Sequence, residues 1–321
     1  MSAHPLKTVF LDYDTVAKDD LDTARLREAA GELILYESDE SRIAERIRDA
    51  DVALLNKLEL TRELLFGAPR LKLVALAATG TNNVDLVAAR ERGIAVCNVR
   101  AYCTASVVQQ VWGLILSLTQ HVDEFSRLSK DGSWVKDEAG TVLRYPIREL
   151  NGRIFGVVGW GELGRGAARV AETFGMRIAI ANRPGERAQA GRMNLDKLLA
   201  KADIVSLHCP LTDATRGLIG ARELALMKPD ALLINTARGA LVDSAALAAA
   251  LKAGKLGGAG IDVLPREPPV NGDPLLDSQI PNLLVTPHIA WAAREARQRC
   301  IDEMAANIRD FRSGGRRGRV V

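Results

Sequence analysis

Short β-prone runs alternate with helical segments along most of this chain, and this alternation is the feature that most restricts its fold. In the first hundred residues, strands are predicted at 7–12, 33–36, 52–55, 73–76 and 93–97. Helices are predicted between them, at 21–30, 41–49, 61–66 and 85–92. Because strands that are separated by helices pair in parallel, this block predicts a parallel sheet with helices on its faces.

A second block of the same kind follows a long uncharged segment at 101–122. It opens with 152–159, whose stretch Ile154–Val158 is a continuous apolar run typical of a strand buried on both faces. Further strands are predicted at 177–181, 204–208, 231–235, 258–262 and 283–286, with helices such as 195–201 and 244–253 between them. Six strands with crossovers predict a doubly wound α/β sheet. The pattern does not decide which block the last helix, 291–312, packs against.

Composition excludes several other classes of protein. The 321 residues correspond to about two domains, and 47% hydrophobic with 26% charged residues rule out a disordered or low-complexity chain. The net charge is +3 and charges of both signs are interspersed, so no nucleic-acid partner is predicted. The basic tail Gly314–Arg319 is the exception, and we interpret it as a solvated end rather than as a basic arm.

Cysteine usage and the N-terminus indicate the compartment. The four cysteines form no C-x-x-C pair, which predicts a reducing compartment and no metal site. The first residues lack the apolar core of a secretory signal. Residues 101–120 carry no charge and are long enough to span a membrane, but Ser, Thr, Gln and Cys interrupt them, which favours a buried helix. We therefore expect a cytoplasmic protein without a membrane partner.

The sequence Gly159-Trp-Gly-Glu-Leu-Gly164 has the G-x-G-x-x-G spacing of a dinucleotide-binding loop. Its context supports this function, because it follows the predicted strand 154–158 and opens a helix predicted at 163–173. Gly159 permits the tight turn, Gly161 lets the backbone approach a pyrophosphate, and Gly164 allows close packing of helix and strand. This site predicts an NAD(P)H cofactor.

The residues that follow the next strand bear on the form of the cofactor. An acidic residue there would bind the ribose 2′-hydroxyl of NAD, but the position is Asn182, which brings no negative charge. The adjacent Arg183 could pair with a 2′-phosphate. This departure favours NADP(H) over NAD(H). The alternative is that Arg183 stacks on the adenine or faces water.

Three polar residues, Arg238, Glu267 and His288, lie at or just beyond the ends of predicted strands in the second block. Open parallel sheets place their ligands at this edge. Taken singly, each residue also has a structural explanation: a surface guanidinium, a loop carboxylate or a capped histidine. Together they form a candidate catalytic set.

The sequences around these three residues resemble, in order and spacing, the signatures of the D-isomer-specific 2-hydroxyacid dehydrogenase family. The resemblance covers the whole chain. It is also carried by His208-Cys-Pro-Leu-Thr212, Met227-Lys-Pro229, Gly239-Ala-Leu-Val-Asp243 and the loop Ala77–Asp85. Within the family, Tyr102-Cys-Thr-Ala-Ser106 and Trp291 are most similar to the glycerate dehydrogenase (hydroxypyruvate reductase) branch.

The resemblance implies an enzyme, an NAD(P)-dependent oxidoreductase that reduces hydroxypyruvate or glyoxylate to D-glycerate or glycolate. Hydride transfer to a 2-oxo acid requires a proton donor for the developing alkoxide and an anchor for the carboxylate. His288 would be the acid in reduction and the base in oxidation. Glu267 would hydrogen-bond the other ring nitrogen, and Arg238 would offer a planar fork to the substrate's carboxylate and carbonyl oxygen.

The same resemblance implies further contacts with substrate and cofactor. The amides of Thr79 and Gly80 would bind the substrate's carboxylate, and Trp291 would lie near the substrate. The cofactor contacts that it implies are Glu162 and Leu163 at the pyrophosphate, Cys209 and Pro210 beside the adenine, and Thr236, Ala237, Arg238, Asp262 and His288 around the nicotinamide ribose and carboxamide.

Family architecture further implies two domains with the substrate in the cleft between them. Residues 1–98 with 289–321 would form a flavodoxin-like substrate domain, and 99–288 would form the dinucleotide-binding Rossmann domain. The family also implies a homodimer built around the uncharged segment 101–120. Burial of that segment inside the monomer is the competing explanation for its lack of charge.

Two other functions remain open at this point. One is a dehydrogenase for another D-2-hydroxy acid of the D-lactate or 3-phosphoglycerate type. A phosphoglycerate would require additional basic residues near the substrate, and Lys57 is the one candidate for such a residue. The other is a dinucleotide-sensing, corepressor-like binding protein. The presence of Arg238, Glu267 and His288 together disfavours the second.

Overall fold

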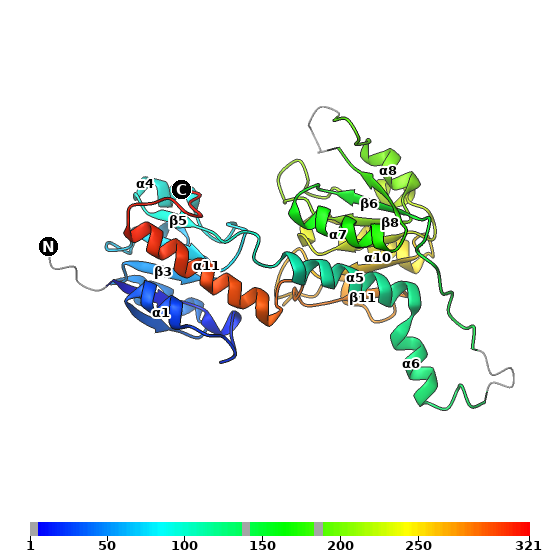
Figure 1. Cartoon of the computed structure of the whole chain (residues 1–321), viewed down its shortest axis with the longest axis horizontal. Helices are drawn as coiled ribbons and strands as arrows, with labels where there is room; N and C mark the ends of the chain where they lie inside the picture. Colours follow the sequence, from blue (N-terminus) through cyan, green and yellow to red (C-terminus); the bar gives the residue numbers. More distant parts are fainter. Residues whose placement is uncertain (1–5, 137–141, 183–188) are drawn as a thin grey trace. The chain divides into compact units, whose positions relative to one another are not determined.

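The computed structural model describes residues 6–136, 142–182 and 189–321. The chain divides into two compact units (Figure 1). Unit 1 consists of Met1–Cys103 together with Trp291–Val321, and unit 2 is Thr104–Ala290. The predicted boundaries, after residues 98 and 288, fall within a few residues of these.

Unit 1 is a parallel five-stranded sheet with helices on both faces. Its strands are β1 (Lys7–Phe10), β2 (Glu32–Leu35), β3 (Val52–Leu55), β4 (Leu73–Leu76) and β5 (Ala95–Cys97), in the order β2-β1-β3-β4-β5. Its helices are α1 (Ala24–Ala30), α2 (Ile43–Ile47), α3 (Arg62–Phe66), α4 (Leu86–Glu91) and α11 (Arg294–Arg312), with short turns η1 (Tyr13–Thr15) and η2 (Glu40–Arg42).

The strands of unit 1 alternate between two apolar clusters because successive side chains point to opposite faces. Val9 lies in one cluster and Phe10 in the other, and neither is exposed. Helices α1 and α11 lie side by side over the face of Phe10 (Figure 1). The last helix therefore packs on the first block, although it follows the second in sequence.

The basic tail pairs with β5 through its backbone, while the side chains of Arg316, Arg317 and Arg319 stay exposed, so Gly314–Arg319 is in contact with solvent but anchored to the sheet. The amide of Asn98 donates to the carbonyl of Gly318 at 2.9 Å, and the amide of Val320 donates to Val96 O at 2.8 Å. Gly318 has φ +63°, and a Cβ there would lie 2.6 Å from Asn98 O. A glycine is therefore required for the tail to approach the strand.

Unit 2 is a parallel six-stranded sheet, also covered on both faces. Its strands are β6 (Ile154–Val158), β7 (Arg177–Ile180), β8 (Ile204–Leu207), β9 (Leu232–Asn235), β10 (Gly258–Ile261) and β11 (Leu283–Val285), in the order β11-β10-β9-β8-β6-β7. Its helices are α5 (Thr104–Gln120), α6 (Val122–Lys130), α7 (Glu162–Thr173), α8 (Leu195–Lys201), α9 (Ala221–Leu226) and α10 (Ser244–Lys252), with turns η3 (Gly239–Leu241) and η4 (Pro274–Leu276).

Helix α5 is buried along one side inside unit 2, which explains why it carries no charge. Its side chains Val111 and Ile115 have no exposed surface, and Trp112 stacks on Phe155 of β6 with ring centres 5.7 Å apart. Gly260 of β10 makes room for this helix, since a Cβ there would lie 2.9 Å from Leu114 Cβ. Burial in the monomer is thus sufficient to account for the uncharged segment.

The predicted fold class, two doubly wound parallel-sheet domains, is confirmed. In both sheets the order reverses beside the first strand, so that the connections diverge to either side of a switch point. Ligands of such sheets bind at the carboxyl ends of the strands near that point. Within residues 6–136, 142–182 and 189–321, no helix is both long and apolar enough to cross a membrane.

Candidate functional site

The glycine-rich loop joins β6 to α7 at the switch point between β6 and β8. Gly159 has φ +106°, and a Cβ there would lie 2.5 Å from the amide nitrogen of Cys209. A Cβ on Gly164 would lie 2.1 Å from Gly159 O. These two glycines are therefore required by the protein's own packing.

Gly161 differs from its two neighbours in the motif. It has extended-type backbone angles, φ −84° and ψ −162°, and a Cβ there would have nothing within 4 Å. Packing against the described residues therefore does not require a glycine at this N-cap position. A ligand that approaches the loop backbone would require one, and the first amides of α7 are suitable donors for a pyrophosphate.

Glu162 and Leu163 are the first residues of α7, as a pyrophosphate contact through the backbone requires. The Glu162 carboxylate accepts a hydrogen bond of 2.5 Å from Thr104 Oγ1 at the start of α5. This bond holds a negative side chain that would otherwise compete with phosphate for the helix N-terminus.

The predicted ribose and nicotinamide contacts follow β7 and β9. Asn182 comes just after β7, and its Oδ1 accepts the amide of Gln189 at 3.1 Å. Arg183 lies outside the described residues. After β9, Thr236 Oγ1 is buried without a hydrogen-bond partner among the described residues, while the amide of Ala237 donates to Asn235 Oδ1 at 3.0 Å. A buried hydroxyl without a partner is rare in folded proteins and fits a position that a ligand completes.

His208 and Cys209 follow β8, and their backbone lies against Gly159 of the glycine-rich loop. Burial lowers the pKa of His208 to about 4, so the ring is neutral, and its Nε2 lies 2.9 Å from Ser206 Oγ. Burial raises the pKa of Cys209 to about 11, which leaves its thiol protonated and unsuited to nucleophilic attack. The adenine contacts predicted for Cys209 and Pro210 stay predictions.

His288 follows β11 in a left-handed backbone conformation, with φ +54°. Such a conformation is unfavourable for a residue with a side chain and persists where neighbours fix it. The fully buried Asp262 supplies that constraint. Its carboxylate accepts the amides of Ile289 and Ala290, each at 2.9 Å, and the hydroxyl of Thr286 at 2.5 Å. These bonds place Asp262 beneath the segment that carries His288. The contact of Asp262 with the carboxamide of the nicotinamide stays a prediction.

Helix α5 also holds this segment through two residues that the sequence analysis missed. Ser106 Oγ donates to Ala290 O at 2.6 Å, and Gln110 Nε2 donates to Thr286 Oγ1 at 3.2 Å. The two residues are four apart and lie on one face of the helix. In the sequence, two polar residues four apart within an otherwise apolar helix could have indicated that this face of the helix holds another segment.

Glu267 connects the loop after β10 to His288. Its Oε2 is hydrogen-bonded to Nδ1 of His288, and its Oε1 accepts the amide of Leu264 at 2.9 Å. The side chains of Glu267 and His288 are each 28% exposed, so the pair is accessible. The structure thus brings together the two residues that the sequence analysis had paired.

Arg238 lies after β9 beside the same loop. The next residue, Gly239, approaches that loop so closely that a Cβ would lie 1.9 Å from the carbonyl carbon of Leu264. Arg238 Nη1 donates to its neighbour Ala237 O at 2.7 Å, and Asn235 Nδ2 fixes the Arg238 carbonyl at 2.8 Å. The guanidinium is therefore positioned at the carboxyl edge of the sheet, next to the loop of Glu267.

The residues at this edge fit a nicotinamide dinucleotide. The open space at Gly161 suits a pyrophosphate, and the unpartnered Thr236 hydroxyl suits a ribose. Glu162, Leu163, Asn182 and Ala237 would add contacts along the same edge. No group of three or more His, Cys, Asp or Glu side chains that could hold a metal ion occurs in the described part of the chain.

The other predicted substrate residues lie in unit 1. Thr79 Oγ1 donates to Val99 O at 2.8 Å, and Thr79 O accepts Asn98 Nδ2 at 2.7 Å, so this loop is fixed. Trp291 packs edge-on against Tyr102, with ring centres 6.5 Å apart. The contacts of Thr79, Gly80 and Trp291 with substrate remain predictions.

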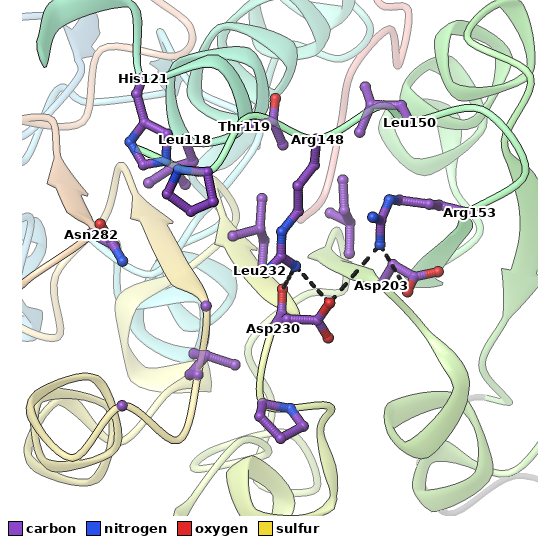
Figure 2. A pocket seen from close by; sticks show the side chains of 16 residues that line it. Leu118, Thr119, His121, Arg148, Leu150, Arg153, Asp203, Asp230, Leu232 and Asn282 are labelled. Carbon is purple, nitrogen blue, oxygen red and sulfur yellow. Dashed lines mark hydrogen bonds and ion pairs between the residues drawn. The ribbon is translucent and has the colours of Figure 1, made fainter. Parts of the chain in front are cut away.

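A pocket of about 260 Å³ lies at the opposite edge of the unit 2 sheet, where β8 and β9 begin (Figure 2). Arg148 Nη1 and Asp230 Oδ2 are 2.6 Å apart, and Arg153 pairs with Asp203 at 3.6 Å. These ion pairs tie the segment before β6 to the residues that precede β8 and β9. The described lining includes none of the predicted site residues, so we assign this pocket a structural role.

Comparison with known proteins gives consistent matches. Residues 112–290 match the family described as "D-isomer specific 2-hydroxyacid dehydrogenase, NAD binding domain". The chain is 41% identical over 310 residues to a glycerate dehydrogenase of Methylorubrum extorquens, with 96% of both proteins covered. It is 35% identical over 317 residues to a hydroxypyruvate reductase of Blautia hydrogenotrophica, covering 96% of this chain and 98% of the relative. Among solved structures, the TT0316 protein of Thermus thermophilus matches with a TM-score of 0.86 at 33% identity, over 98% of this chain and all of that one.

Proposed function

Because the chain belongs to the D-isomer specific 2-hydroxyacid dehydrogenase family, we propose that His288, Glu267 and Arg238 carry out reduction of hydroxypyruvate or glyoxylate. The chain is an oxidoreductase that acts on CH–OH groups and uses a nicotinamide dinucleotide. The hydrogen bond between His288 Nδ1 and Glu267 Oε2, at the carboxyl edge of the unit 2 sheet, carries the proposal. The names of the two relatives favour the three-carbon substrate, hydroxypyruvate.

Each residue of the candidate site has a different role in the reduction. When bound, the reduced dinucleotide supplies the hydride that adds to the C2 carbonyl. Because Glu267 holds Nδ1 of His288, Nε2 is the atom that donates a proton to the developing alkoxide and takes it back in oxidation. The Glu267 carboxylate stabilises the imidazolium, and the Arg238 guanidinium pairs with the substrate's carboxylate.

Removal of the proton donor tests this assignment. His288→Ala should lower kcat for hydroxypyruvate by roughly 10²–10⁴-fold, the usual share of general acid–base catalysis. Glu267→Gln, which keeps a hydrogen-bond acceptor and removes the charge, should cause a smaller loss. Steady-state rates give both values, and titration of cofactor fluorescence checks that binding survives. A kcat of His288→Ala equal to that of the wild type would refute the mechanism.

The substrate class is tested by initial rates of the wild type with four 2-oxo acids. Faster reduction of pyruvate or 3-phosphohydroxypyruvate than of hydroxypyruvate and glyoxylate would refute the proposed substrate class.

For the cofactor we propose a preference for NADP(H), supported by the uncharged Asn182 after β7 and by Arg183, which lies outside the described residues. In Asn182→Asp, a carboxylate would repel the 2′-phosphate and accept the 2′-hydroxyl of NADH. The KM for NADPH should rise at least tenfold, while the KM for NADH falls. A tenfold change corresponds to roughly 1.4 kcal/mol of binding free energy. Initial rates with both cofactors measure the change, and an unaltered ratio would contradict the proposal.

We also propose a homodimer formed by α5 and its surroundings, in particular by the described residues that follow α6, 131–136 and 142–147, which we call the α6 segment. Large apolar side chains are exposed there: Val135 is 88% and Leu143 83% exposed, and Trp134 and Ile147 are each more than half exposed. A second copy of the chain is a suitable partner for such a surface. The cytoplasmic location is likewise a proposal, supported by four cysteines that form no disulfide.

A further inference from the structure

A pocket in unit 1 gathers basic side chains where the chain leaves that unit. Its volume is about 500 Å³. The charged lining comes from α1, from residue 100 after β5, from α11 and from the C-terminal tail. The residues concerned are Arg25, Arg100, Arg299, Arg317, Asp302 and Glu303.

The folding of the tail is what brings the fourth arginine to this pocket. Gly315 lies against Asp310 so closely that a Cβ would be 2.1 Å from Asp310 Oδ2. The amide of Arg317 donates to the same carboxylate at 2.7 Å. The glycines and the Asp310 contact therefore turn the tail back, and they fix Arg317 beside α11.

The acidic residues of the pocket neutralise only part of its charge. Arg317 pairs with Glu303 at 2.6 Å, and Arg25 lies 3.7 Å from Asp302. Arg299 Nε donates a hydrogen bond to the carbonyl of Tyr102 at 2.8 Å. A carbonyl carries no net charge, so this bond does not compensate the positive charge of the guanidinium. Arg100 has no hydrogen bond or ion pair with any described residue. Four guanidinium groups thus face two carboxylates, a local excess of two positive charges.

We propose that this pocket binds a small dianion of the phosphate-monoester class. A phosphate monoester carries close to two negative charges at neutral pH and three acceptor oxygens, which matches the excess charge. Arginine binds such oxygens through paired N–H groups, and its charge does not titrate in this range. The volume exceeds that of phosphate alone, so a small organic substituent can be accommodated. The site is separate from Arg238, and the proposal does not depend on the proposed reaction.

Calorimetric titration with inorganic phosphate and with glycerol 3-phosphate tests the site. The measurement is made on the full chain in the Arg238→Gln background, so that an anion at the candidate active site does not contribute. Ionic strength is held constant with chloride. We expect saturable binding that Arg100→Ala weakens at least tenfold, because the substitution removes one of the two lining charges that no described carboxylate compensates. Arg100 is exposed and its removal breaks no contact with a described residue, so the variant should fold. Arg316→Ala removes an exposed charge from the same tail without touching the pocket, and it should leave the dissociation constant within twofold.

The pH dependence provides a second readout. The second pKa of a phosphate monoester is near 6, so the ligand loses one charge below that pH while the arginines keep theirs. Binding should therefore weaken several-fold between pH 7.5 and pH 5. The proposal is overturned by absence of saturable binding, by equal losses in Arg100→Ala and Arg316→Ala, or by tighter binding of succinate than of glycerol 3-phosphate. Unchanged melting temperature and unchanged hydroxypyruvate kinetics in Arg100→Ala, measured with Arg238 intact, would confirm that only the pocket was altered.

Discussion

Single residues at the site differ in how far the sequence reveals them. Arg238, Glu267 and His288 could be found because each follows a strand whose apolar run marks its end. The support beneath His288 could not be found in this way. The contacts of Gln110 with Thr286 and of Ser106 with Ala290 join residues far apart in the chain, and they exist only because α5 packs on the sheet.

Gln110 should act as a positioning residue for His288. Its hydrogen bond to Thr286 Oγ1 helps to hold the left-handed segment, and loss of one such bond costs about 1 kcal/mol. Gln110→Ala should lower kcat roughly fivefold, since a misplaced proton donor raises the barrier by a similar amount. The KM for the cofactor should not change.

The neighbouring exposed residue offers a control for this prediction. Gln109→Ala removes the same side chain from the same helix without a contact to the His288 segment, and it should retain wild-type kcat. Steady-state kinetics on both variants decide the matter. Equal kcat values for the two variants would show that Gln110 does not position His288.

At the scale of elements, the strands were predicted more accurately than the helix ends. Strands β3, β4 and β6 begin and end where their apolar runs do. Helices α5 and α11 are shorter than predicted, beginning at Thr104 and Arg294. Helix starts depend on contacts outside the helix. Trp291, for example, packs on Tyr102 before α11 begins.

The loop between β6 and α7 predicts opposite outcomes for two glycines of one motif. Gly161→Ala should lower the melting temperature only slightly, because alanine is a poorer N-cap residue but its Cβ would meet no described atom, yet it should weaken cofactor binding at least tenfold by occupying the pyrophosphate space. Gly164→Ala should instead lower the melting temperature by several degrees, because its Cβ would meet Gly159 O at 2.1 Å. Thermal unfolding and cofactor titration separate the two effects. A large stability loss in Gly161→Ala would contradict this account.

At the scale of the whole molecule, local pattern could not assign the last helix or the tail. Helix α11 has an apolar face of Ile301, Met304 and Ile308 that would suit either sheet, and only the structure shows it beside α1. The tail's exposed arginines fit the predicted solvated end, but its backbone pairing with β5 was not predicted, because its glycines and arginines show no strand pattern. Its close approach to Asn98 and Asp310 is a tertiary effect.

Quaternary structure gives a prediction at the same scale. If the α6 segment joins two copies, Val135→Asp should place a charge in the interface and shift the protein to monomer in light scattering after size-exclusion chromatography. Val87→Asp is a matched control, because it places the same charge at a 59% exposed valine that belongs to unit 1. A wild-type chain that runs as a monomer would contradict the proposed dimer.

The assembly of unit 1 from both ends of the chain has a consequence for biosynthesis. Helix α11 covers a sheet face that includes Phe10, Leu54 and Leu73, yet it is translated only after all of unit 2. At about 5–20 residues per second, the ribosome needs roughly ten to forty seconds to make the intervening residues. During that interval the apolar sheet face of the nascent chain is not covered by α11. We therefore expect that the nascent chain needs protection from aggregation until the last helix has been made.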